Sequence, residues 1–217
     1  MKIWDISPLI DGELKVWPGD TPMSREVVCE LQKGASVTLS TLRATVHLGS
    51  HVDGPNHYGK GAAGVEAWPI ERFLGPCHVL DAQTKRGIRA RIEDVRWPDA
   101  DLSGSDALRK IRLPRVLLKT GTYPDCREFN EDFAGLEPSL IDAMVARGVR
   151  TIGVDTPSVD SFSSKDLPAH AACLRGDVAI IEGLVLLDVP GGEYELIALP
   201  LKLAGFDASP VRAVLRG

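Results

Sequence analysis

Short apolar runs alternate with glycine, proline and charged residues along most of the chain. Most of these runs are too short for helices, and they are rich in leucine and in the β-branched residues that fill buried strands. The segment 37–46 also alternates in part between apolar and polar side chains, as expected of a strand with one buried face. The pattern predicts strands at 37–46, 116–119, 151–154, 178–181, 184–187 and 196–199.

Two segments between these runs carry helix start and stop signals. Residues 138–147 begin with a proline and are followed by Gly148, and residues 168–175 begin with a proline and are followed by Gly176. Proline suits the first turn of a helix, and glycine suits the position after its end. Strands that alternate with helices predict an α/β domain.

The segment 188–194 is rich in turn residues and lies between two of the predicted strands. It therefore predicts a hairpin, which makes the expected sheet mixed rather than purely parallel. No internal repeat, low-complexity tract or linker divides the chain. We expect residues 1–217 to form a single domain.

Composition and charge narrow the class of function. The 217 residues are 44% hydrophobic and 25% charged, which is an ordinary globular balance. The net charge is −5, and the basic residues are scattered rather than gathered in a stripe that would bind nucleic acid. Asp5, Asp11 and Glu13 interrupt the N-terminal apolar residues, so this stretch does not resemble a signal peptide, and no window matches a membrane span. We expect a cytoplasmic protein with a small-molecule partner, and neither nucleic acid nor membrane.

Several reactive residue types have no pattern that indicates chemistry. The four cysteines are widely spaced with no Cys-x-x-Cys pair, so we expect free thiols rather than a zinc cluster or redox pair. His78 is isolated before an apolar run, which favours a structural role. The stretch Thr120-Gly-Thr122 follows a predicted strand, and we interpret it as a turn, with pocket lining as the alternative.

Three of the five histidines fall within the run His47-Leu-Gly-Ser-His51-Val-Asp53-Gly-Pro-Asn-His57. With the period of two of a strand, His47, His51 and Asp53 project to one side together with His57, and the leucine and valine between them face a core. Gly49 would leave a gap between two imidazoles for an ion. A helical pairing of the histidines is disfavoured by the glycines and the proline, so we expect a strand that runs into a loop.

Imidazole and carboxylate ligands without thiolate suit zinc, manganese or iron, and zinc is the commonest of these in hydrolases. A packed core has no use for so many polar groups in succession, which favours a metal site. A second region offers candidates to complete the ligand set. His170 lies in the first turn of the second predicted helix, and Glu182 directly follows the strand predicted at 178–181.

The run from His47 to His57 resembles the His-x-Gly-Thr-His-x-Asp-x-Pro-x-His signature of the metal-dependent hydrolases called cyclases, which include kynurenine formamidase and isatin hydrolase. Ser50 replaces the usual threonine and keeps its hydroxyl. Four further stretches look like the formamidase branch in particular: 17–20, 153–158, 164–170 and 181–184. The resemblance implies an α/β fold with a central twisted mixed sheet or barrel-like core and outer helices, and a homodimer with sites near the subunit interface.

The same resemblance assigns roles to individual residues. It implies that one zinc ion is bound by His47, His51 and Asp53, and that Asp53 also reaches a second ion. His170 and Glu182 match the remaining ligand positions, with Glu182 as another bridge. Two zinc ions per subunit are therefore expected, with manganese as the alternative.

His57 matches the general acid/base of the family, and Trp17 matches a position that contacts the aromatic substrate. The resulting hypothesis is an arylformamidase of tryptophan degradation through kynurenine, which hydrolyses N-formyl-L-kynurenine to L-kynurenine and formate. The alternative is an isatin-type cyclic amide hydrolase, and a weaker one is a binding module that uses metal only for stability. The chain has no Gly-x-Ser-x-Gly elbow and no glycine-rich nucleotide loop, which argues against a serine hydrolase and a nucleotide enzyme.

Overall fold

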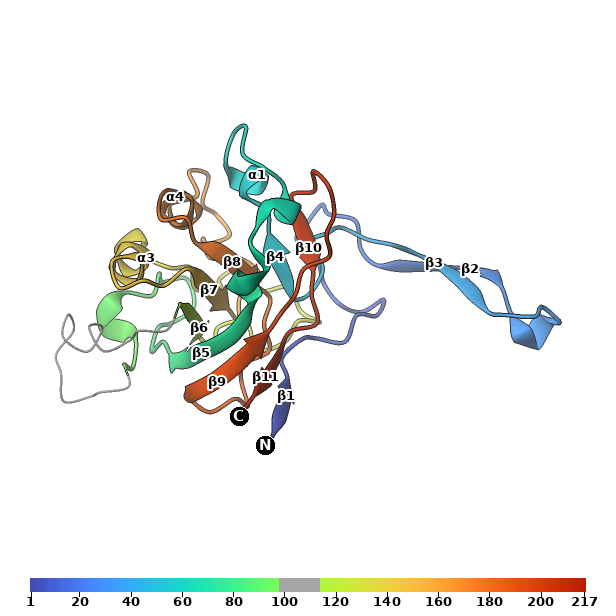
Figure 1. The fold of residues 1–217 in the computed structure, drawn as a ribbon, viewed down its shortest axis with the longest axis horizontal. Coiled ribbons are helices and arrows are strands. Elements are labelled where there is room, and N and C mark those ends of the chain that lie inside the picture. Colours follow the sequence, from blue (N-terminus) through green and yellow to red (C-terminus); the bar gives the residue numbers. More distant parts are fainter. Residues whose placement is uncertain (98–113) are drawn as a thin grey trace.

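A mixed sheet forms the body of the protein in the computed structural model, which describes residues 1–97 and 114–217 (Figure 1). Its strands lie in the order β1-β11-β9-β5-β6-β7-β8-β4-β10 and curl into a half-barrel. They are β1 (Ile3–Asp5), β4 (His51–Asp53), β5 (Leu74–Asp81), β6 (Arg115–Lys119), β7 (Thr151–Val154), β8 (Ala179–Glu182), β9 (Gly192–Ile197), β10 (Ala208–Pro210) and β11 (Val214–Arg216).

The centre of the sheet is parallel and its flanks are antiparallel. Strands β5, β6, β7 and β8 pair in parallel, whereas β9, β11 and β1 on one side and β4 and β10 on the other pair antiparallel. The parallel strands are buried on both faces, which explains their nearly continuous apolar sequences. The predicted α/β fold with a mixed, barrel-like sheet is confirmed.

Successive residues of the central strands fill two separate cores. In β6, the side chains of Val116 and Leu118 pack on one face, and that of Leu117 packs on the other. The first face is covered by the helices α3 (Pro138–Val145) and α4 (Pro168–Arg175), which contribute Leu140 and Ala172 among others (Figure 1). The second face is closed by the curled flanks of the sheet itself. The parallel strands are thereby held rigidly enough to position side chains at their ends.

Both predicted long helices are present. Each begins with a proline in its first turn, and α4 has the predicted bounds while α3 ends at Val145, two residues before the predicted end. The described residues also include the shorter helical segments α1 (Pro55–Tyr58), η1 (Leu31–Lys33), η2 (Val65–Ala67), η3 (Ile70–Phe73) and η4 (Ile92–Asp94). No helix within the described ranges is long and apolar enough to cross a membrane.

A two-stranded arm projects from the body of the protein (Figure 1). It consists of β2 (Ser24–Cys29) and β3 (Leu39–Arg43), which pair with each other and not with the main sheet. The strand predicted at 37–46 is therefore present over a shorter range. Nearly every residue of the arm is exposed, including the apolar Val28, Leu39 and Leu42.

Two predictions near the C-terminus are wrong. Residues 184–187 alternate between buried and exposed side chains as a strand would, but they join no ladder and instead make single backbone hydrogen bonds to Val154 and Ile6. The segment 188–194 is not a hairpin, because β9 pairs with β5 and β11, and three strands separate it from β8. Of the strand predicted at 196–199, only Leu196 and Ile197 lie in β9. Alternation alone does not identify a partner strand.

Candidate metal centre

Strand pairing brings three of the predicted ligands together. His51 and Asp53 stand on β4, and His51 lies directly opposite Glu182, the last residue of β8. His170 reaches the same point from the first turn of α4. All four side chains are almost completely buried. The end of the parallel sheet therefore carries two imidazoles and two carboxylates in contact.

The route by which His47 and His57 reach the centre differs from the predicted strand. The chain bends at Gly49, whose φ is +58°, and β4 begins only at His51. A Cβ at Gly49 would contact Pro8 at 3.1 Å, so this glycine does not make room for an ion and instead permits the bend. After β4, Pro55 starts helix α1, which carries His57. The predicted residues therefore lie close together, but the backbone that carries them is not the uniform strand that the spacing predicted.

Glu182 is shared between two histidines, and Asp53 is shared among three. His51 Nε2 lies 3.5 Å from Asp53 Oδ1 and 3.3 Å from Glu182 Oε2. His170 Nε2 lies 3.5 Å from Asp53 Oδ2 and 3.7 Å from Glu182 Oε1. His47 Nδ1 lies 3.3 Å from Asp53 Oδ1, the same oxygen that faces His51. Each carboxylate therefore presents one oxygen to each half of the centre.

The donor set fits a divalent cation. Within the described ranges, four buried atoms at this centre have no hydrogen-bond partner, namely His51 Nε2, both carboxylate oxygens of Asp53, and His170 Nε2. An unsatisfied buried polar atom costs about 1–3 kcal/mol, and a charged one costs more. The ligand atoms of His51, Asp53 and Glu182 lie within 4.8 Å of one another, and so do those of His47, Asp53 and His57. Nitrogen and oxygen donors of this kind suit zinc or manganese.

The electrostatics of the centre also favour positive charge. Burial lowers the pKa of His51, but Asp53 and Glu182 outweigh burial and raise the pKa to about 10. Burial likewise opposes the increase at His170, whose pKa is raised to about 10 by Asp160 and Asp53. Burial raises the pKa of Asp53, but the surrounding imidazoles hold it well below its usual value. Protons and metal compete for the same atoms, so we expect metal binding to release protons.

Outer partners fix the orientation of each imidazole. The Nδ1 atoms of His51 and His170 lie 2.9 Å from the carbonyl oxygen of Gly49 and from Asp160 Oδ2, respectively. These bonds direct both Nε2 atoms toward the shared carboxylates, an arrangement typical of metal-ligating histidines. His47 is held from outside by Asp207, whose Oδ2 lies 3.0 Å from Nε2.

Asp160 and Asp207 also support the centre, although no sequence motif predicts a role for either. Asp160 accepts hydrogen bonds from Arg89 and from the backbone N–H groups of Ala169 and His170. Burial opposes the shift, but these donors and the His170 ring lower the pKa of Asp160 to about 2. The only sequence signal for Asp160 is a carboxylate ten residues before a candidate ligand. Asp207 reaches the site because β10 pairs with β4, which the sequence did not predict.

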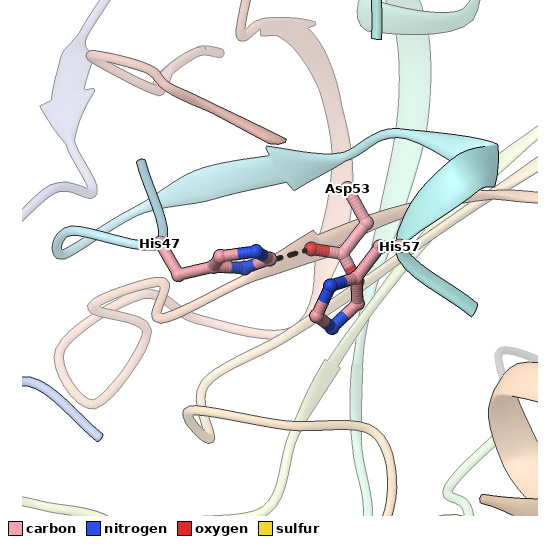
Figure 2. Close-up of side chains that lie close together, drawn as sticks. All are labelled: His47, Asp53 and His57. Atoms are coloured by element: carbon pink, nitrogen blue, oxygen red, sulfur yellow. Dashed lines mark ion pairs between the residues drawn. The ribbon is translucent and has the colours of Figure 1, made fainter. Parts of the chain in front are cut away.

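His57 lies at the open side of the centre. Figure 2 shows His47 reaching from the loop before β4 toward Asp53, while His57 approaches the same carboxylate from helix α1. The His57 ring centroid is 4.3 Å from that of His47 and 5.9 Å from that of His170. Burial lowers the pKa of His57 below its ordinary value, which favours the neutral ring that is able to accept a proton.

A cavity of about 490 Å³ opens onto the centre. Its lining includes Trp17, Tyr123 and Phe129 as well as four histidines: His47, His51, His57 and His170. Trp17 packs against Phe129 and Phe162 with ring centroids 5.7 and 4.9 Å apart. We call Trp17, Tyr123 and Phe129 the aromatic wall. An apolar cavity with polar groups converging at one end is the usual form of a small-molecule site.

The residues for which the sequence predicts no catalytic or metal-binding role lie partly at the cavity and partly away from it. The four cysteines are free thiols, as expected, although Cys126 lines the cavity. His78 is buried in β5 and does not line the cavity, which agrees with a structural role. The stretch Thr120-Gly-Thr122 does turn after β6, and Gly121 also lines the cavity, so both interpretations of that stretch hold.

Gly183 is required by the close approach of the two ligand-bearing segments. Its φ is +68°, and a Cβ there would lie 2.3 Å from the carbonyl oxygen of Gly49. We expect Gly183→Ala to lower the free energy of unfolding by about 2–5 kcal/mol, from left-handed strain plus overpacking. Urea denaturation measures this. Gly61→Ala is the control, because Gly61 also has positive φ but open space around its Cβ, and it should cost about 1 kcal/mol. Equal losses in both variants would contradict the packing argument.

The fold and the centre define an α/β protein with histidine and carboxylate side chains gathered around the end of the parallel strand β8, beside an apolar cavity. The model of the Cyclase family matches residues 4–161, and the chain belongs to this family. The family indicated by the sequence resemblance is therefore confirmed.

Solved structures with the same fold cover nearly the whole chain. One, described as a potential metal-dependent hydrolase with cyclase activity, is 28% identical with a TM-score of 0.80, covering 99% of this chain and 96% of the other. A predicted metal-dependent hydrolase from Bacillus stearothermophilus is 27% identical with a TM-score of 0.75, covering 99% and 97%. Isatin hydrolase A from Labrenzia aggregata, bound to benzyl benzoate, is 22% identical with a TM-score of 0.74, covering 99% and 93%, and shows likeness of fold alone.

Proposed function

We propose that this protein is a metal-dependent amide hydrolase that converts N-formyl-L-kynurenine to L-kynurenine and formate. The observation that carries the proposal is that the imidazoles of His51 and His170 share Asp53 and Glu182 and line a cavity with aromatic residues. Such a donor set suits the two-metal centres that hydrolyse amides and esters. The two relatives described as metal-dependent hydrolases support the reaction class.

Five side chains would hold zinc, or manganese as the alternative: His47, His51, Asp53, His170 and Glu182. A divalent ion bound there supplies a water molecule with a lowered pKa and polarisation of the formyl carbonyl. The chain itself fixes the donors, through the Gly49 carbonyl behind one imidazole and the Asp160 carboxylate behind another. Preorganised donors need no rearrangement during the reaction.

His57 would move the proton in this reaction. Its neutral ring accepts a proton from the attacking water and then delivers it to the departing arylamine nitrogen. Half-exposed at the cavity, the ring can reach the substrate without leaving the neighbourhood of His47. Proton delivery is needed because an arylamine anion is a poor leaving group.

The aromatic wall supports an aromatic amide as substrate. Trp17 and Phe129 offer ring faces and edges on which an anthraniloyl ring can stack, and such contacts add about 0.5–1.5 kcal/mol beyond the area buried. Because the aromatic wall and His57 line the same cavity, a substrate whose ring stacks on the wall would have its formamide group near His57.

The experiment that tests the function is hydrolysis of N-formyl-L-kynurenine by the purified protein before chelation, after chelation and after zinc is added back. We expect hydrolysis to disappear with the metal and to return with it, because the donors alone cannot activate water. Product formation is followed by the absorbance of L-kynurenine, and bound metal is measured by atomic emission. Manganese in place of zinc tests the alternative ion.

Other results would change the assignment. Absence of formamide hydrolysis by metal-loaded protein, together with metal-dependent opening of isatin, would replace the proposal with the cyclic amide alternative. Tight metal binding without hydrolysis of either substrate would favour the metal-stabilised binding module. Hydrolysis that survives complete removal of metal would contradict a metal mechanism altogether.

We further propose that the protein is a homodimer joined through its projecting arm. The arm and the segment that joins its two strands expose several apolar side chains, which are costly to leave in water: Val27, Val28, Leu31, Val37, Leu39 and Leu42. We expect Leu42→Asp to shift the protein toward monomer in sedimentation velocity at micromolar concentration. Ile70→Asp, an equivalent change at an exposed residue of the body, should leave the dimer intact. A monomeric wild-type protein would contradict the proposal.

A further inference from the structure

Asp155 is a buried carboxylate with no part in the proposed reaction. It directly follows β7, lines the cavity and is 6% exposed. Within the described part of the chain, its side chain accepts hydrogen bonds from the turn after β6. Its oxygens accept from the backbone N–H of Thr120 at 3.0 Å, from the Thr120 hydroxyl at 2.7 Å, and from the backbone N–H of Gly121 at 2.8 Å. Asp155 therefore holds the ends of two neighbouring strands together on the cavity side.

The turn that Asp155 holds is itself hydrogen-bonded to the segment that follows it. The Thr120 hydroxyl lies 2.8 Å from the Thr122 hydroxyl, which accepts a hydrogen bond from the backbone N–H of Ala134 at 3.0 Å. The carbonyl oxygen of Thr122 accepts from the side-chain amide of Asn130 at 3.2 Å. Both ends of the segment 123–133 are thereby fixed to one turn.

The segment 123–133 contains most of the aromatic wall. Tyr123 and Phe129 line the cavity, and the buried Phe133 packs behind both, with ring centroids 6.1 and 6.3 Å away. Trp17 comes from a distant part of the sequence and is held by edge contacts with Phe129 and Phe133. The position of the wall therefore depends on the turn, and the turn depends on Asp155.

We propose that Asp155 is a positioning residue that determines affinity for the aromatic part of the substrate, acting through Thr120 and Thr122 on the aromatic wall. The inference rests on the proposed function for the identity of the aromatic ligand. In Asp155→Asn, one oxygen becomes an NH₂ group that faces N–H donors, so at least one of the four hydrogen bonds is lost and the turn shifts.

Asp160 is a matched comparison on the same segment. It is buried like Asp155, but it bonds to His170 rather than to the turn. Its replacement by Asn should weaken metal binding about 10–100-fold, as is usual for a partner behind a metal-ligating histidine. The two Asp→Asn variants, five positions apart in sequence, should therefore affect different ligands: Asp155→Asn the aromatic ligand, and Asp160→Asn the metal.

The experiment compares wild type, Asp155→Asn, Thr120→Val and Asp160→Asn as zinc-loaded proteins. Calorimetry measures the dissociation constant of L-kynurenine, and chelator competition measures that of zinc. We expect Asp155→Asn to weaken L-kynurenine binding about ten-fold with unchanged zinc affinity, and Asp160→Asn to do the reverse. Thr120→Val removes the hydroxyl that links Asp155 to Thr122, so it should weaken L-kynurenine binding in the same way. It tests the same connection if Asp155→Asn does not fold. The double variant Asp155→Asn/Thr120→Val should bind L-kynurenine no more weakly than the weaker-binding single variant, because both substitutions break the same connection.

The outcomes separate this inference from the proposed function. Suppose that wild type binds L-kynurenine and hydrolyses the formamide, and that Asp155→Asn and Thr120→Val bind L-kynurenine as tightly as wild type. This result overturns the role of Asp155 but leaves the proposed function intact. A parallel loss of zinc and L-kynurenine affinity in Asp155→Asn also overturns it, since that is general structural damage. Wild type that neither binds L-kynurenine nor hydrolyses the formamide overturns the proposed function and with it this inference.

Discussion

Asp53→Asn should lose both metal and activity. The side chain keeps its shape, but the negative charge shared by three imidazoles disappears from a site that is completely buried. Removing one partner of a buried charge cluster costs about 3–5 kcal/mol, which corresponds to a loss of about a hundred- to several thousand-fold in metal affinity. We expect atomic emission to find little zinc in the purified variant, and formamide hydrolysis to fall at least as much.

Asp207→Asn is the matched control for this prediction. Asp207 also contacts His47 through a carboxylate oxygen, at 3.0 Å, but its side chain is 48% exposed, so water can replace the lost interaction. The expected loss of metal affinity is less than about ten-fold. An Asp53→Asn protein that keeps its full metal content and turnover would show that the buried carboxylate is not a ligand, and the centre would have to be reassigned.

The central fold was predictable because burial on both faces leaves a direct trace in sequence. The strands β6, β7 and β8 are continuous apolar runs, and the two longer helices begin with proline in the first turn. Strand β5 was missed because Gly75, Pro76 and His78 interrupt its apolar pattern. Glycine is favoured at position 75 by its positive φ and by the Arg115 side chain, which lies 3.3 Å from where a Cβ would be. Arg115 lies far from Gly75 in sequence, so the local pattern does not reveal this contact.

The candidate site was predictable where its residues are close in sequence. His47, His51 and Asp53 were found as a cluster, although the uniform strand proposed for them is broken by the bend before His51 and by helix α1 after Asp53. Asp155 and Asp207 act on the site through pairing between distant strands. One sequence records which residues are present, but it does not record which strand ends become neighbours.

His57→Gln should reduce turnover by about 10²–10⁴-fold while metal content stays at the wild-type level. The glutamine can form hydrogen bonds but cannot accept and release a proton. The wild-type rate should fall as the pH drops through the lowered pKa of His57, because the protonated ring is no longer a base. This acid limb should be absent in the variant. Steady-state rates from pH 5 to pH 8, with atomic emission on the same samples, measure both effects.

The contrast with His78→Gln makes the role of His57 specific. His78 is also buried, and its pKa is also lowered by burial, but it does not line the cavity, so the same substitution should leave turnover and its pH profile unchanged. Loss of metal from His57→Gln would instead make His57 a ligand. That outcome has a structural basis, because its ring nitrogen lies within 4.8 Å of ligand atoms of His47 and Asp53. Retained metal with a flattened pH profile separates the proton carrier from the ligand.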